Sequence, residues 1–345
     1  MENIKLTQFS PGAGCGCKIS PSELEEILLR VPAGMVDPFL LVGRESKDDA
    51  AVYDLGNGTA VISTTDFFTP IVDDAYVFGQ IAACNALSDV YAMGGRPVMA
   101  ISILGWPLDK LEKSLAGDVV KGASDICTTA GIVLAGGHSI DIPVPVFGLA
   151  VTGVIPTNHI RKNNTAVAGC KLLLSKPLGT GIISTAAKRG IVSKEHLDIS
   201  VRQMIHLNRL GESLGGIAGV RAMTDVTGFG LLGHLLEICE GSRVRATANF
   251  SAIPVIPGLE DYMQQKAIPG GTYRNWKSYG HKISEITENQ RLLLCDPQTN
   301  GGLLIAVEPG SLAAVYEQAL RSGDALYEIG ELANPRGSDE LIRIV

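Results

Sequence analysis

The chain has 345 residues, a formal net charge of −7, and a composition that is 46% hydrophobic and 19% charged. This length exceeds the usual size of one hydrophobic core and the composition is that of a folded protein, so we expect two globular domains. The acidic balance, with no clustered Lys and Arg, excludes a general nucleic-acid binder.

No stretch reaches the roughly 18 consecutive apolar residues of a membrane span, and the first residues lack the pattern of an export signal. We therefore expect a cytoplasmic protein with no membrane partner. The seven cysteines, an odd number spread through a long chain, do not resemble a disulfide framework. They indicate a reducing compartment, in which a thiol can serve as a reagent.

Residues 1–20, called the leader below, are polar and rich in glycine and show no periodicity, so we expect a mobile segment. A helix start follows it. We expect Ser20 as the N-cap, Pro21 as the first helical residue and Glu23 as the capping-box partner, with the helix running to about Arg30.

Two apolar runs that begin at Ala50 and Thr59 flank the tripeptide Gly56-Asn57-Gly58, which predicts a β-hairpin. If its last two residues form the turn, Asp49 lies opposite Asp66. Like charges directly opposite each other destabilise a sheet, so this register calls for a cation between them. The alternatives are another register, or two carboxylates that point into water.

A helical pattern runs from Tyr76 to Met93, ends at paired glycines, and puts Asn85 and Asp89 on one face. Strand and helix patterns then alternate, which predicts a fold of the α/β or α+β class. They occupy 98–104, 108–130, 132–135 and 146–155 before a polar break at 156–158, and 169–172, 181 onward, 231–239 and 301–307 after it. The break predicts one domain at 21–156 and another at 157–345.

The leader contains Gly-Ala-Gly-Cys-Gly-Cys-Lys at 12–18, where glycines place two thiols and an ammonium group on an adaptable backbone. It is not a Walker A loop, because Cys17 precedes Lys18 and no strand comes before it, and one cysteine pair is too few for a structural zinc site. Lys18 favours a thiolate nearby and can hold a phosphate oxygen. The alternatives are a disordered tail with incidental cysteines and a redox-active pair.

Acidic residues recur at the ends of the predicted elements, namely Asp48, Asp49, Asp66, Asp89 and Asp225. Mg²⁺ in nucleotide sites takes a few carboxylates together with water and substrate phosphates. Acids from separate segments are therefore what a nucleotide-magnesium site needs. The alternative for any one of them alone is a solvated surface acid.

Residues 135–139, Ala-Gly-Gly-His-Ser, predict a strand that runs into paired glycines, whose N–H groups suit an anionic ligand. The alternative is an ordinary turn in which His138 is a satisfied buried histidine. The loop at 296–302 has the same character in the second domain. The remaining cysteines lie in or beside apolar runs and are predicted to be small buried hydrophobes: Cys84, Cys127, Cys170, Cys239 and Cys295.

Seven motifs stand in a characteristic order: GAGCGCK at 12–18, DDAAVYDLGNG at 48–58, STTDFF at 63–68, NALSD at 85–89, AGGHSID at 135–141, MTDVTGFGLLGH at 223–234 and CDPQTNGGLL at 295–304. Together they resemble the selenophosphate synthetase family over nearly the whole chain. The resemblance implies two α/β domains of the aminoimidazole ribonucleotide synthetase-like fold, with the N-terminal domains of a homodimer pairing into a barrel-like sheet. It implies that ATP, selenide and water give selenophosphate, AMP and orthophosphate, with Mg²⁺ as cofactor and selenide or a selenium-delivery protein as partner.

By position, the resemblance makes Cys15 and Lys18 catalytic and makes Asp49, Asp89 and Asp225 magnesium ligands. It implies contacts to ATP at Lys18, Ser46, Lys47, Asp48, Asp66, Asp89, Gly137, His138 and Ser139. Two positions depart from the family pattern, because Pro11 replaces a frequent histidine and Asn300 replaces a frequent serine. These departures bear on closure of the leader and on loop contacts in the second domain.

Two other functions remain open. One is a different ATP-using member of the same superfamily, such as a thiamine-phosphate kinase, a purine-pathway synthetase or a hydrogenase-maturation enzyme, which the cysteine-bearing leader disfavours. The other is a non-enzymatic selenium or metal carrier that uses Cys15 and Cys17. A carrier of that kind has no use for the acidic residues.

Overall fold

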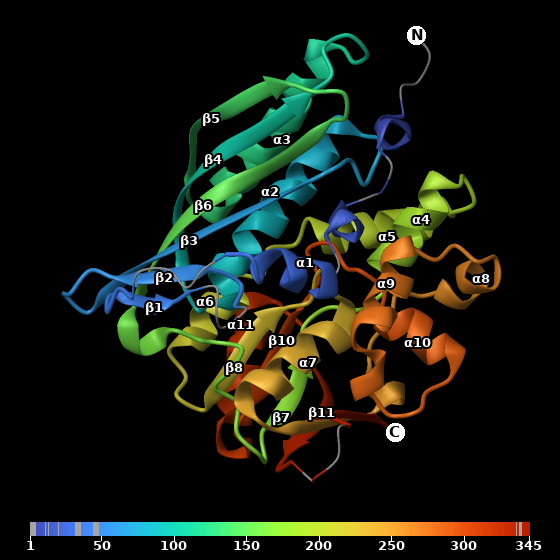
Figure 1. Cartoon of the computed structure of the whole chain (residues 1–345). Helices are drawn as coiled ribbons and strands as arrows, with labels where there is room; N and C mark the ends of the chain where they lie inside the picture. Colours follow the sequence, from blue (N-terminus) through green and yellow to red (C-terminus); the bar gives the residue numbers. More distant parts are fainter. Residues whose placement is uncertain are drawn as a thin grey trace.

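The computed structural model describes residues 5–345 except 11, 13, 20, 32–35, 44–47, 336 and 338–339. Within these residues the strands form two six-stranded sheets, in the orders β1-β2-β3-β6-β4-β5 and β12-β9-β11-β7-β10-β8 (Figure 1). The first sheet consists of β1 (Leu40–Val42), β2 (Ala51–Asp54), β3 (Thr59–Phe68), β4 (Arg96–Trp106), β5 (Val133–Asp141) and β6 (Val146–Pro156). The second consists of β7 (Lys171–Leu174), β8 (Val220–Asp225), β9 (Arg245–Ala248), β10 (Leu303–Val307), β11 (Tyr327–Ala333) and β12 (Ile342–Ile344).

The described helices are distributed over both halves of the chain, and the predicted mixed α/β class is confirmed. They are α1 (Pro21–Leu28), α2 (Ala75–Ala92), α3 (Lys113–Ala130), α4 (Thr180–Lys188), α5 (Lys194–Met204), α6 (Leu210–Gly215), α7 (Gly230–Ser242), α8 (Leu259–Gln264), α9 (Gly270–Tyr279), α10 (Glu288–Leu294) and α11 (Leu312–Ser322). Short 3₁₀ helices η1 (Leu6–Phe9) and η2 (Gly14–Cys17) lie in the leader.

One face of the first sheet is covered by two helices that pack against each other, α2 over β3 and β6 and α3 over β4 and β5. In β3, Ala60 and Ile62 are buried against this helix layer, while Thr65 and Phe67 are exposed on the other face. Successive residues of a strand point to opposite faces, so this alternation identifies a sheet covered on one side. Helix α2 also contacts β8, α5 and α6 of the second half, which explains why it is buried on nearly every side.

The backbones of α2 and α3 touch because glycine stands at their crossing point. A Cβ atom on Gly79 would lie 1.9 Å from the carbonyl oxygen of Val119, and one on Gly122 would lie 2.0 Å from that of Tyr76. Real Cβ atoms do not approach backbone so closely. Any larger residue at either position therefore forces the two helices apart.

Gly122→Ala is expected to lower the free energy of unfolding by about 2–3 kcal/mol, because the helix pair must separate in a close-packed core. Gly117→Ala on the same helix is the matched control, since no heavy atom lies within 4 Å of its Cβ position. Alanine is the better helix former, so the control is expected to be neutral or to stabilise by up to about 1 kcal/mol. Urea denaturation measures both values, and an equal change in the two variants would show that close packing at Gly122 does not determine the result.

The predicted hairpin between β2 and β3 is confirmed, but its predicted register is wrong by one residue. Ala51 pairs with Ser63 and Asp54 pairs with Ala60, which leaves all three of residues 56–58 in the loop. Asp49 therefore precedes β2 and does not lie opposite Asp66 in a cross-strand pair.

Side-chain hydrogen bonds explain the longer loop. Asp54 Oδ1 accepts from the Gly56 N–H at 2.9 Å, and Asn57 Oδ1 accepts from the Thr59 N–H at 3.1 Å. Gly56 and Gly58 both have positive φ, which glycine adopts without strain. Asx-type turns at both ends thus stabilise a three-residue loop over the two-residue turn.

Two further predictions need correction. Helix α3 begins at Lys113, not at Leu108, because the N–H groups of Lys110 and Leu111 bond to the Pro107 carbonyl in a separate turn. Strand β5 continues through Asp141, so Gly137, His138 and Ser139 form strand and not a turn. Ladder pairing with β4 through this segment overrides the local glycine signal.

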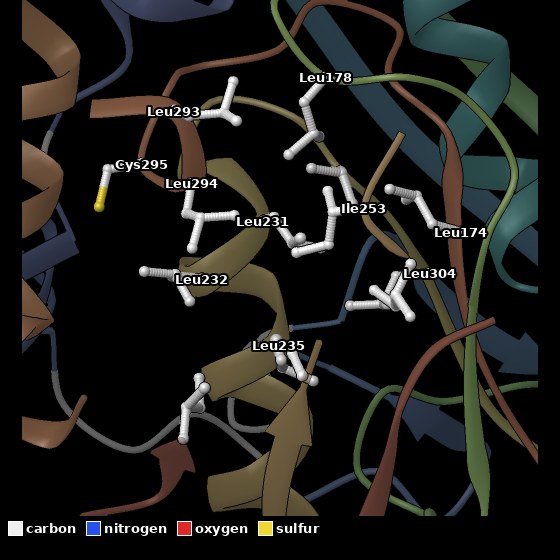
Figure 2. Close-up of a cluster of buried hydrophobic side chains, with 14 of the residues drawn as sticks. Leu174, Leu178, Leu231, Leu232, Leu235, Ile253, Leu293, Leu294, Cys295 and Leu304 are labelled. Atoms are coloured by element: carbon white, nitrogen blue, oxygen red, sulfur yellow. The ribbon is translucent and has the colours of Figure 1, made fainter. Parts of the chain in front are cut away.

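The second sheet is covered on both faces, which accounts for its continuous apolar strands. Leu172 and Leu174 belong to the core beneath α7, whereas Leu173 belongs to the core beneath α6 and α11. Figure 2 shows Leu231, Leu232 and Leu235 of α7 surrounded by side chains of β7, β10 and α10. Strands buried on both sides lose the alternation of apolar and polar residues.

Cysteines of the two cores behave as small apolar residues, as predicted. The described free cysteines Cys84, Cys127, Cys170, Cys239 and Cys295 are all buried. Burial raises the pKa of Cys84, Cys239 and Cys295 to about 12, so these thiols stay protonated and unreactive at neutral pH.

The beginning of the leader, at Leu6 and Thr7, is docked on the first half of the chain. Leu6 is fully buried in the first core, and Thr7 Oγ1 donates to Asp73 Oδ1 at 2.6 Å. Mobility of the leader stays a prediction, as does the domain division after Pro156. Among the described helices, none combines the length and the apolar character that crossing a membrane requires.

Candidate active site

Acidic side chains from separate segments line one cavity of about 170 Å³, called the acid cavity below. Its lining residues are Lys18, Asp48, Asp49, Thr64, Thr65, Asp66, Asp89, Asp225, Thr227, Phe229, His234 and Glu237. They come from the leader, the segment before β2, β3, α2, and the stretch from β8 into α7. The structure thus brings together the five acids and the lysine that the sequence singled out.

Helix α2 and strand β3 supply two matched contacts on one wall. Thr64 Oγ1 donates to Asp89 Oδ2 at 2.5 Å, and Asn85 Nδ2 donates to Asp66 Oδ2 at 2.5 Å. Four residues on a helix and two on a strand both span about 6–7 Å, so the two pairs stay in register. The one-face alternation of β3 is what turns both of its polar side chains toward the helix.

The second half of the chain reaches this wall through Asn300. Its N–H donates to Asn85 Oδ1 at 2.7 Å, which orients the amide so that Nδ2 faces Asp66. Asn300 has a φ of 46°, a left-handed conformation that asparagine tolerates. Buried Lys176 donates to the Asn300 carbonyl at 3.1 Å and so supports the loop from below.

Asp225 and Asp49 form the opposite wall. Asp225 is the last residue of β8 and is only 1% exposed. Its neighbour Thr224 donates through Oγ1 to Asp49 Oδ1 at 2.8 Å, which holds the segment before β2 against the second half. Asp48 Oδ1 accepts from the Asn163 N–H at 2.6 Å, so both consecutive acids tie the two halves together.

Lys18 of the leader lines the acid cavity beside Asp66. Its Nζ lies 3.3 Å from Asp66 Oδ1. The lysine side chain is 37% exposed, and a partly exposed ion pair of this kind adds little stability. The ammonium group is therefore able to exchange Asp66 for another anion without a large loss.

Burial and mutual repulsion raise the pKa of the clustered carboxyls. For Asp49 the pKa rises well above its usual value through burial and then through Asp225 and Asp89. Burial, with Asp66 and Asp225, does the same to the pKa of Asp89. Burial also raises the pKa of Asp225, although the Ser88 hydroxyl and nearby cations oppose it. Without a cation, so many acids in one small cavity oppose each other's ionisation.

The donor set fits Mg²⁺. Asp49 Oδ2 and Asp225 Oδ2 are buried and have no hydrogen-bond partner among the described residues. They are hard carboxylate oxygens, the ligands that Mg²⁺ prefers. Within the described ranges no group of three or more His, Cys, Asp or Glu is arranged to hold a metal alone. A cation here would therefore complete its shell with water or substrate phosphate, as Mg²⁺ commonly does.

Sequence reasoning assigned no role to the histidine-bearing side of the acid cavity. His234 stacks on Phe229 at 5.6 Å between ring centroids, and its Nε2 lies 3.3 Å from Thr227 Oγ1. Its Nδ1 is 3.1 Å from Glu237 Oε2. The sequence offered one signal for this residue, because His234 ends the motif at 223–234 and falls near the start of α7.

Other predicted site residues lie elsewhere. Gly137, His138 and Ser139 are on β5, the edge strand of the first sheet, and do not line the acid cavity. Ser46 and Lys47 fall outside the described residues. Cys15 belongs to η2, between glycines that the structure describes, and nothing is described of its side chain.

Both halves of the chain match known protein families. Residues 47–155 match the family described as AIR synthase related protein, N-terminal domain, and residues 167–341 match its C-terminal domain. A selenide, water dikinase of Cronobacter sakazakii is 57% identical over 341 residues, covering 99% of this chain and 98% of the relative. That of Escherichia coli K12 is 56% identical over 342 residues, covering 99% of both.

Solved structures share the fold at low identity. A thiamine-monophosphate kinase from Stenotrophomonas maltophilia superposes with a TM-score of 0.65 at 18% identity over 94% of each chain. The hydrogenase maturation protein HypE of E. coli gives 0.62 at 21% identity, over 90% of this chain and 89% of its own. The two-domain AIR synthase-like fold is thereby confirmed. The chain belongs to the selenide, water dikinase family within the AIR synthase-related proteins.

Proposed function

We propose that this chain converts ATP, selenide and water to selenophosphate, AMP and orthophosphate, the activity of a selenide, water dikinase. The observation that carries the proposal is the acid cavity, where carboxylates from both halves of the chain face Lys18 of the leader. Identity of 56–57% to selenide, water dikinases over the whole chain supports the same activity.

In this proposal Asp49, Asp89 and Asp225 hold Mg²⁺, which supplies positive charge to the triphosphate when bound. Lys18 exchanges Asp66 for a phosphate oxygen and stabilises the charge that develops on the transferred group. The further ATP contacts are Ser46, Lys47, Asp48, Asp66, Asp89, Gly137, His138 and Ser139. Because β5 lies away from the acid cavity in one chain, its three residues would act on another part of the nucleotide or across a dimer.

The reaction proceeds in two phosphoryl transfers, the first to selenide and the second to water. Selenide attacks the γ-phosphorus, a Se–P bond forms, and the bond to the bridging oxygen breaks with ADP as the leaving group. Water then attacks the β-phosphorus of ADP, loses a proton, and releases AMP and orthophosphate. In the first transfer the Cys15 thiolate accepts the proton that hydrogen selenide loses as the Se–P bond forms, and the seated leader keeps bulk water away from the reacting atoms.

We also propose a homodimer that forms through the open face of the first sheet. Phe67, Met99, Ile101 and Val133 are between 44% and 64% exposed on the face that turns away from α2. Contiguous exposed apolar side chains of this kind mark an interface. Light scattering is expected to give twice the mass of one chain.

The proposal also includes a cytoplasmic location. The selenium donor is selenide or a selenium-delivery protein, and the protein has no stable nucleic-acid partner.

Nucleotide product analysis tests the activity against its rivals. With ATP, Mg²⁺ and selenide we expect AMP and orthophosphate, formed only when selenide is present. Another kinase or synthetase of the superfamily would yield ADP without selenide dependence. A selenium or metal carrier would bind no nucleotide, so an absence of ATP binding would overturn the proposed activity.

A further inference from the structure

Two cationic side chains of the second half hold the backbone of the leader. Lys188, the last residue of α4, donates through Nζ to the Ser10 carbonyl at 2.6 Å and to the Gly12 carbonyl at 3.3 Å. Arg274 of α9 donates through Nη2 to the Gly16 carbonyl at 2.9 Å. These contacts lie on both sides of Cys15. Charged donors to carbonyl oxygens are among the stronger hydrogen bonds in proteins.

A second cavity lies between this segment and the helices that carry the two cations. Gly12 and Gly16 form part of the wall of this cavity, of about 390 Å³, whose other walls include α4 and α9. Lys188, Arg189 and Arg274 all line it. Lys188 and Arg274 reach from these helices to carbonyl groups of the leader, so their hydrogen bonds join parts of the chain that this cavity otherwise separates.

The middle of this segment fits closely between the two halves of the chain. The Gly14 N–H donates to the Thr69 carbonyl at 3.3 Å. A Cβ on Gly14 would lie 2.5 Å from Ile71 Cδ1 and 2.6 Å from Thr299 Oγ1. The backbone before Cys15 is therefore closely fitted at Gly14, and the two cations hold it on either side of this point.

We infer that Lys188 and Arg274 are positioning residues, which seat the leader so that Lys18 lines the acid cavity and the η2 backbone that carries Cys15 is held in place. The inference rests on the proposed function. The fraction of molecules with a seated leader sets the fraction that is competent for transfer, so losing either contact lowers kcat in proportion. ATP binding depends mainly on the acid cavity and is affected less.

The test compares Lys188→Met and Arg274→Gln, singly and combined, with Arg189→Met as the matched control. Arg189 carries the same charge in the same cavity, but it bonds to the Gln265 carbonyl and to none of the leader residues that the structure describes. The first measurement is the rate at which iodoacetamide alkylates Cys15 and Cys17, mapped by mass spectrometry. The five buried cysteines react slowly and do not interfere.

We expect each single variant to raise the alkylation rate and to lower kcat for selenophosphate by about tenfold, with KM for ATP changed less than about twofold. The double variant is expected to exceed either, Arg274→Lys to restore most of the loss, and Arg189→Met to match the wild type. Unchanged alkylation in the folded double variant, or an equal effect of Arg189→Met, would overturn the inference. Failure of the proposed function is separate, because the wild type would then make no selenophosphate while alkylation still reports the seated leader.

Discussion

Cys15→Ser is expected to lower selenophosphate formation from selenide by at least about 100-fold, while ATP affinity stays within about twofold of the wild type. A serine hydroxyl stays protonated at neutral pH, whereas a cysteine thiol ionises much more readily and its thiolate can accept the proton that hydrogen selenide loses. The backbone contacts of the flanking Gly14 and Gly16 do not involve the substituted atom. The loss therefore reports the chemistry of the thiol and not the seating of the leader.

Cys17→Ser is the matched control, because Cys17 lies in the same 3₁₀ helix and offers the same thiol two residues away. We expect this variant to keep most of the activity. Selenophosphate output is best followed together with nucleotide binding by calorimetry. If Cys15→Ser forms selenophosphate at the wild-type rate, the Cys15 thiol takes no part in the reaction. If both variants lose activity equally, the losses come from a changed conformation of the leader and not from one thiol.

Asp225→Asn is expected to cost about 10²–10³-fold in Mg²⁺-dependent ATP turnover and, at the same time, to stabilise the metal-free protein by about 1 kcal/mol. The substitution keeps the shape of the side chain but removes one of the buried carboxylates that repel each other. Its Oδ2 has no hydrogen-bond partner among the described residues, so no such contact is lost at this atom. Opposite effects on activity and stability are what a site built for a cation predicts.

Turnover measured against Mg²⁺ concentration and thermal unfolding in a chelator give the two values. Asp118→Asn, which removes an exposed acid on α3 outside the acid cavity, controls for the change in net charge. It is expected to change neither quantity. Unaltered turnover in Asp225→Asn would exclude it as a ligand, and a lower melting temperature would show that the carboxylate stabilises the fold by itself.

Much of the site follows from the sequence because local patterns determine where its residues fall. The helical pattern from Tyr76 to Met93 put Asn85 and Asp89 on one face, and the structure pairs them with Asp66 and Thr64 of β3. The hairpin register was less predictable, since the choice between a two-residue and a three-residue loop depended on Asx contacts of Asp54 and Asn57. The paired glycines at 136–137 predicted a turn, but this segment is part of strand β5. Its hydrogen bonds to β4 outweigh the local preference of glycine for turns.

Contacts between distant segments had no local signal. Lys188 and Arg274 bind carbonyl groups of the leader, and a carbonyl exists at every residue, so no pattern of side chains marks the pairing. The same holds for the Asn300 N–H that orients Asn85. His234 was visible in its motif, but its stacking on Phe229 depends on where α7 starts. Such contacts become evident only when the two halves are packed together.

The most direct measurement is phosphorus NMR of the wild-type protein with ATP, Mg²⁺ and selenide. We expect a resonance of a phosphorus atom bonded to selenium, with coupling to the spin-active selenium isotope, that grows together with AMP and orthophosphate. Consumption of ATP without a phosphorus–selenium species would contradict the proposed reaction and leave the acid cavity to a different phosphoryl transfer.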